Sequence, residues 1–110
     1  MANIVTVNDI TAIKRYELAD VIAGLGNLEM VRIMNSFIDT KFASLGYRRI
    51  IATHGNCSDA RAAEYFIQTA ANMLLPINVL CAHVKQMTPN SRLVTDWLIA
   101  NGYYNEPITA

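Results

Sequence analysis

The sequence has few charged residues and no long apolar run. Charged residues make up 16% of the 110 residues, and nine basic residues balance nine acidic ones, so the formal net charge is zero. A neutral chain lacks the long-range field that attracts nucleic acid or an anionic membrane, so binding to nucleic acid is not expected. No apolar run reaches the roughly 20 residues of a membrane-spanning helix, so no membrane association is expected either.

Cysteine is also scarce. The two cysteines, Cys57 and Cys81, are too few for a disulfide framework. The N-terminus lacks the basic segment and following apolar stretch of a signal peptide. These absences predict a reduced, cytoplasmic protein, although a single disulfide between the two cysteines stays open.

Apolar residues, in contrast, are abundant. They make up 53% of the chain, which is enough for a hydrophobic core, and 110 residues suit a single domain. We therefore predict one domain over residues 1–110, in which residues 103–110 form a C-terminal tail without periodicity. The low charge favours a further buried surface, so a homo-oligomer is expected.

Four segments have the apolar spacing of amphipathic helices. In the third segment, for example, Ala63, Phe66, Ile67, Ala70, Ala71 and Leu74 follow the i, i+3, i+4, i+7 pattern. Glycines end three of the four segments, and Thr88 with Pro89 resembles the entrance of the last helix. The predicted helices cover residues 11–23, residues 27–45, residues 58–74, and the segment from Thr88 to Gly102.

Three short segments are predicted as strands because they are apolar and rich in β-branched residues. These segments are residues 3–7, 47–53 and 77–84. Strands that alternate with helices are typical of a parallel sheet with helices on its faces. The sequence thus predicts an α/β fold, with a small parallel, Rossmann-like sheet flanked by helices. The open edge of such a small sheet is a second reason to expect a homo-oligomer.

The loop after the second predicted strand is the expected binding site. In open α/β sheets, ligands bind beyond the carboxyl ends of the strands, where helix N-termini present free N–H groups. This loop has a glycine, which lets the backbone approach a ligand, and neutral hydrogen-bonding side chains. The candidate ligand-binding residues of the loop and helix start are Thr53, His54, Gly55, Asn56, Ser58 and Asp59, and Asn90 and Arg92 from the last helix entrance are expected to close the site.

The same loop carries a resemblance to a known family. Residues 50–63 resemble the strand, His-Gly turn and alanine-rich helix of small Rossmann-like domains in the SLOG superfamily, and residues 75–79 and 88–92 are similar to its later turns. The resemblance implies a nucleotide or nucleotide-derived ligand, and it places Asn8 at the turn after the first strand. The catalytic Pro-Gly-Gly-x-Gly-Thr-x-x-Glu motif of one branch is absent. We therefore expect a sensor, carrier or sequestering protein without a cofactor.

Other interpretations of the same residues stay open. His54 resembles the phosphorylated histidine of mannose-family phosphotransferase components, and Cys57 near a helix N-terminus has the setting of a thiolate nucleophile. Either residue would make the chain a phosphoryl-transfer or hydrolytic enzyme. His54, Cys57, Cys81 and His83 together have the composition of a zinc site. A structural or interaction protein, which engages another chain through its sheet edge or its tail, is the remaining alternative.

Overall fold

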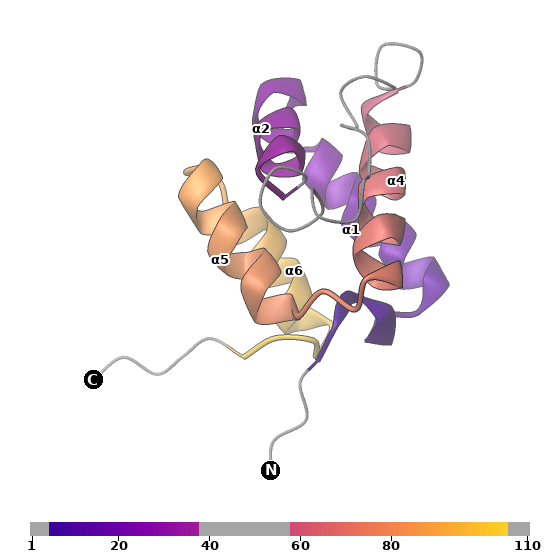
Figure 1. Ribbon diagram of the computed structural model, residues 1–110. Helices are drawn as coiled ribbons and strands as arrows, with labels where there is room; N and C mark the ends of the chain where they lie inside the picture. Colours follow the sequence, from indigo (N-terminus) through magenta and orange to yellow (C-terminus); the bar gives the residue numbers. More distant parts are fainter. Residues whose placement is uncertain (1–4, 38–57, 106–110) are drawn as a thin grey trace, which may run out of the picture.

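The computed structural model describes residues 5–37 and 58–105 (Figure 1). These residues form a bundle of α-helices and one short 3-10 helix. Within the described ranges no strand is present, and the only β contact is an isolated antiparallel bridge between Thr6 and Pro76. None of the helices in those ranges has the length and apolar character needed to cross a membrane. The elements are η1 (Val7–Asp9), α1 (Ala12–Ala23), α2 (Asn27–Phe37), α4 (Asp59–Asn72), α5 (Ile77–Met87) and α6 (Arg92–Ala100).

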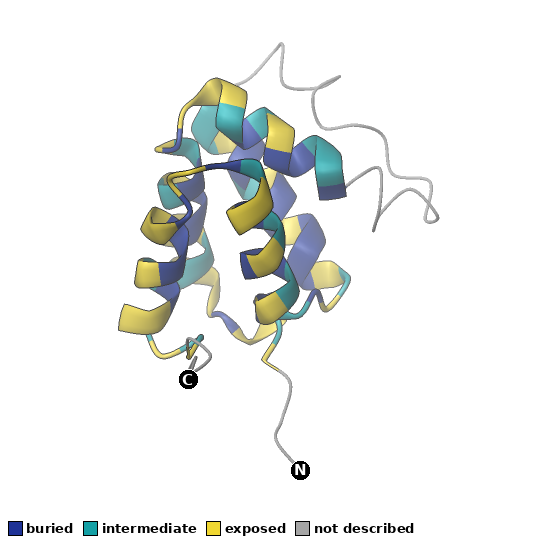
Figure 2. Cartoon of the chain, turned by 90° about the vertical axis from the view of Figure 1, so that its left-hand side faces the viewer, coloured by how far each residue is buried: buried dark blue, intermediate teal, exposed yellow. Residues whose placement is uncertain are grey.

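The bundle is built around the pairing of α1 with α4, which pack on each other most extensively. Helix α6 packs on α1, and α2 packs on α5 (Figure 1). Each helix turns its apolar stripe inwards, and Figure 2 shows these buried stripes facing the middle of the bundle. The largest fully buried side chains are Phe37, Phe66, Ile10, Leu18, Ile22, Met30, Ile33, Met34, Ile67, Ile77 and Leu80.

The helices α1 and α4 start where the sequence predicts. Thr11 is the N-cap of α1, and its hydroxyl accepts a hydrogen bond from the backbone N–H of Lys14 at 3.4 Å. Ser58 caps α4 in the same way, accepting from the N–H of Arg61 at 3.2 Å. A side chain of this kind satisfies one of the N–H groups that have no partner within the helix. The predicted helices over residues 11–23 and 58–74 are thus confirmed.

The predicted α/β fold is wrong for the described residues, and the segment at residues 77–84 shows why. This segment belongs to helix α5, whose buried positions Ile77, Leu80, Cys81 and Val84 have the spacing i, i+3, i+4, i+7. A short apolar run fits a strand and a helix equally well when only its composition is considered. The helix-forming residues that follow it extend the run to eleven residues, which is long for a strand and normal for a helix.

The first predicted strand is also wrong over its described part, although an extended contact exists there. The N–H of Val7 donates to the carbonyl of Leu75 at 2.8 Å, and the N–H of Ile77 donates to the carbonyl of Val5 at 2.9 Å. The chain then turns at once into η1, where the Asp9 carboxylate accepts from the N–H of Thr6 at 2.8 Å. These two backbone bonds fix the start of α1 beside the end of α4, and α1 and α4 are therefore antiparallel. The remaining predicted strand, residues 47–53, lies outside the described residues.

The last helix begins later than predicted. Ser91, not Thr88, is the N-cap residue of α6, and the Thr88 hydroxyl instead accepts from the N–H of Asn90 at 3.1 Å. Leu93, near the start of this helix, is 54% exposed. After α6 the chain folds back, so that Tyr103 stacks on Trp97 with ring centroids 6.2 Å apart. The described start of the predicted tail therefore packs on α6.

Candidate functional site

The predicted binding loop is mostly outside the described residues. Thr53, His54, Gly55, Asn56 and Cys57 all fall there, so their predicted roles stay predictions.

The described part of the loop acts in helix capping and packing. Ser58 is the N-cap of α4, and Asp59 accepts a hydrogen bond from the side-chain amide of Asn27 at 3.0 Å, which ties α4 to α2. Among the described residues, this place holds the start of a helix in a helical bundle.

The other described candidate residues lie in η1 and at the entrance of α6. Asn8 is exposed in η1, beside the C-terminal end of α4, whereas Asp59 starts the same helix. A helix of 14 residues is about 20 Å long, which separates these two candidates. Asn90 and Arg92 lie at the start of α6, where Arg92 forms an exposed ion pair of 3.5 Å with Asp96. Asn8 and Asp59, two residues of the predicted single site, therefore lie at opposite ends of α4.

The described half of the candidate zinc site is not assembled either. Cys81 and His83 are two residues apart on α5, so their side chains point about 200° apart around the helix instead of sharing a strand face. Cys81 is buried, and burial raises the pKa of its thiol from 9.0 to about 11, although nearby Lys85 opposes this shift. Across residues 5–37 and 58–105, no group of three metal-ligating side chains occurs. His54 and Cys57 are outside these ranges.

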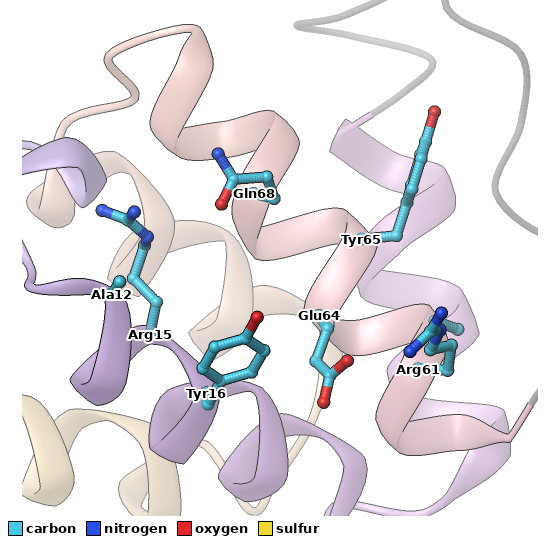
Figure 3. A pocket seen from close by; sticks show the side chains of 8 residues that line it. Ala12, Arg15, Tyr16, Arg61, Glu64, Tyr65 and Gln68 are labelled. Carbon is cyan, nitrogen blue, oxygen red and sulfur yellow. The ribbon is translucent and has the colours of Figure 1, made fainter.

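A groove between α1 and α4 is a candidate site of the described structure (Figure 3). It encloses about 580 Å³, a volume within the range that is typical of small-molecule sites. Its walls combine cationic, aromatic and amide side chains from the two helices. The groove is lined by Ala12, Arg15, Tyr16, Arg61, Ala62, Glu64, Tyr65 and Gln68.

Arg15 is the most firmly positioned charge in the groove. Its Nη1 donates a hydrogen bond of 2.7 Å to the carbonyl oxygen of Ile10, and the side chain is half-buried. A guanidinium has five N–H donors in a rigid plane, so one bond to Ile10 leaves the others for a second partner. No acidic side chain of the described residues forms an ion pair with Arg15. The cation is thus held in place without being neutralised.

Two further charged groups come from α4. Arg61 lies in its first turn and is exposed, while Glu64 follows three residues later and is half-buried. In the described part of the chain, neither side chain forms a hydrogen bond or an ion pair with another residue. The groove therefore carries two positive charges, from Arg15 and Arg61, and one negative charge, from Glu64, so positive charge is in excess.

Two tyrosines supply the aromatic surface of the groove. Tyr16 from α1 is 59% exposed, and Tyr65 from α4 is 56% exposed. Figure 3 shows the ring of Tyr16 in the middle of the groove, while Tyr65 extends away from it along the upper side. Gln68 donates from Nε2 to Asn72 at 3.0 Å, which leaves its carbonyl oxygen for another partner. An exposed aromatic ring beside a fixed cation is a surface on which a planar ligand can stack.

The sequence contains a weak signal for this groove. Arg61, Gln68 and Asn72 fall between the apolar positions of the segment at residues 58–74, and Tyr65 lies in the same segment. The polar positions of α4 recur at helical spacing, which shows that they share a face. Nothing in the sequence tells that this face meets the corresponding face of α1, because that pairing depends on the antiparallel packing of two distant helices.

Comparison of the chain with protein-family models, curated proteins and solved structures finds no match. The resemblance to the SLOG superfamily is therefore neither supported nor tested by known relatives. The Rossmann-like fold that this resemblance implies is not the fold of the described residues.

Proposed function

We propose that this chain is a binding protein, and that the groove between α1 and α4 holds a small organic anion with a planar apolar body. The observation that carries this proposal is the fixed position of Arg15, whose guanidinium is anchored on the Ile10 carbonyl at 2.7 Å inside the wall of a cavity. A ligand carboxylate that pairs with an already ordered guanidinium avoids most of the entropy cost of ordering that side chain.

The size and the composition of the groove indicate a small-molecule site instead of a charged surface without a binding role. An open cavity of about 580 Å³ accommodates a ring compound, and the exposed face of Tyr16 supplies a surface for the ring. Hydrogen bonds to a charged partner are stronger than neutral ones, so the anionic group gives orientation while the ring gives apolar contact.

Binding is favoured over catalysis by the side chains that are present. Among the described residues that line the groove, none is a serine, cysteine or histidine. The groove therefore lacks serine and cysteine nucleophiles and the imidazole that most often acts in general acid–base catalysis. A carrier or sensor role needs only the cation, the aromatic surface and the cavity.

Calorimetric titration with 4-ethylbenzoate and with its neutral amide, 4-ethylbenzamide, tests this proposal. We expect the carboxylate to bind and the amide to bind at least about tenfold more weakly, because one charge-assisted pair contributes roughly 1.5–3 kcal/mol. The variant Arg15→Gln should lose most of the affinity for the carboxylate. The matched control Arg32→Gln removes one exposed positive charge from α2, outside the groove, and should leave the affinity nearly unchanged. Equal binding of both probes, or binding of neither, would overturn the proposal.

A further inference from the structure

The charged residues of the groove follow one another along its length. Their order restricts the class of ligand more than the excess of positive charge does. Because α1 and α4 are antiparallel, Arg15 in the first half of α1 lies near the C-terminal half of α4, where Gln68 lines the groove. Glu64 is one helical turn before Gln68, and Arg61 is nearly one turn before Glu64. Figure 3 shows Arg15 and Glu64 on opposite sides of the Tyr16 ring.

The negative charge of Glu64 disfavours an anionic ligand unless the ligand also carries a group that donates hydrogen bonds to Glu64. Glu64 as a residue is half-buried, and its carboxylate lacks a hydrogen-bond donor or a cationic partner among the described residues. A ligand that covers it would remove more water from it, and a desolvated carboxylate without a partner is strongly unfavourable. A ligand group that donates hydrogen bonds to Glu64 converts this penalty into a favourable contact.

We infer that the ligand is an aromatic carboxylate that carries an ammonium group at the opposite end of its ring, with the carboxylate on Arg15, the ring on Tyr16 and the ammonium on Glu64. This inference rests on the proposed function, and it specifies the class of ligand for the same site. Glu64 and Gln68 are one helical turn of four residues apart on α4, which corresponds to about 6 Å. Because Arg15 lies near the half of α4 that holds Gln68, the contacts of the ligand with Arg15 and with Glu64 are separated along the groove. A ring with substituents at opposite ends has a comparable span, whereas an α-amino acid places both charges at one end.

The experiment uses three probes that share one ring and differ only in their charged groups. These are 4-(aminomethyl)benzoate with both charges, 4-ethylbenzoate without the ammonium, and 4-methylbenzylamine without the carboxylate. We expect 4-(aminomethyl)benzoate to bind the full chain at least about fivefold more tightly than 4-ethylbenzoate. The amine should bind most weakly, because it faces two positive charges in the groove.

Two variants locate the effect. Glu64→Gln should abolish the preference for 4-(aminomethyl)benzoate over 4-ethylbenzoate, while 4-ethylbenzoate itself binds as well as before or better. The matched control Glu17→Gln removes an acidic group from α1 that pairs with Lys14 at 3.3 Å outside the groove, and it should retain the preference. Circular dichroism and a urea titration establish that both variants fold.

The possible failures are distinguishable. If 4-ethylbenzoate binds through Arg15 as tightly as 4-(aminomethyl)benzoate, the inference about the ammonium is wrong and the proposed function stands. The same conclusion follows if the preference exists but survives in Glu64→Gln. If the amine binds and neither carboxylate does, the proposed function fails together with the inference. If no probe binds, both are overturned.

Discussion

The hydroxyl oxygen of Ser36 lies 3.1 Å from Nδ1 of His83, and this hydrogen bond joins the last described turn of α2 to α5. The imidazole also lies against Phe37, with ring centroids 4.2 Å apart and an interplanar angle of 32°. Phe37 in turn contacts Phe66 of α4, with a centroid distance of 5.5 Å. One polar contact and two aromatic contacts therefore connect three helices at this place in the core.

The substitution Ser36→Ala should lower the free energy of unfolding by about 1–2 kcal/mol, because it removes the hydroxyl partner of a half-buried imidazole nitrogen. The measurement is urea denaturation followed by circular dichroism. In a His83→Phe background the same substitution should cost clearly less, since the hydrogen bond is then already absent. An equal loss in both backgrounds would mean that Ser36 does not act through His83.

How much the sequence predicts depends on how local the deciding signal is. For α1 and α4 the signal is local, because a capping side chain stands directly before an apolar stripe of helical period. For residues 77–84 the period-two and helical patterns overlap, and the choice is made by packing against α2 and α6, which a single sequence does not display. The errors at this segment and at residues 5–7 remove the described part of the predicted sheet and, with it, the open edge that favoured a homo-oligomer.

The site was harder to predict than the helices for the same reason. Arg15 and Arg61 are separated by 46 positions in the sequence and line the same groove only because α1 and α4 pack antiparallel. The anchor of Arg15 is a backbone carbonyl at Ile10, and a backbone acceptor has no residue-specific signature. In contrast, the chemistry of their side chains alone makes His54 and Cys57 candidates, although both lie outside the described residues.

Leu74 is the only residue other than glycine with a positive φ in the described ranges, at 56°. It stands at the end of α4, where the N–H of Leu75 donates to the carbonyl of Ala70 at 3.0 Å, and its side chain is 58% exposed. A side chain in this left-handed region costs about 1 kcal/mol, and glycine avoids most of that cost. We therefore expect Leu74→Gly to raise the free energy of unfolding by about 0.5–1 kcal/mol in urea denaturation.

The same substitution at Leu93 is the matched control. Leu93 is similarly exposed, at 54%, but it lies within α6. Glycine inside a helix is less favourable than other residues by about 1 kcal/mol, so Leu93→Gly should destabilise the protein. Opposite signs for the two variants identify the backbone conformation as the cause, whereas destabilisation by both would show that Leu74 is not strained.

Stability should fall in alkaline solution because of Cys81. Burial raises the pKa of its thiol from 9.0 to about 11 in the folded protein. Above pH 9 the unfolded chain loses the thiol proton while the folded chain retains it, so the unfolded state gains stability as the pH rises from 9 towards 11. Between pH 8 and pH 10.5 we expect this thiol to account for a loss of about 2 kcal/mol.

Because lysines and tyrosines titrate in the same interval, the informative quantity is the difference between the unmodified chain and Cys81→Ala. Urea denaturation at both pH values should show the smaller alkaline loss in the alanine variant. An identical loss in both proteins would indicate that the folded state does not shield Cys81.

The anchor of Arg15 leads to a prediction that separates the role of charge from that of geometry. Arg15→Lys retains the positive charge, but an ammonium group cannot reproduce the planar fork that bonds Ile10 and a ligand carboxylate together. We expect this variant to bind 4-ethylbenzoate at least about fivefold more weakly than the unmodified chain. Arg61→Lys should bind within about twofold, because Arg61 is exposed and no residue of the described chain holds its guanidinium. Calorimetric titration of both variants measures the two affinities, and an equal effect of the two lysine substitutions would show that the Ile10 contact does not prepare Arg15 for binding.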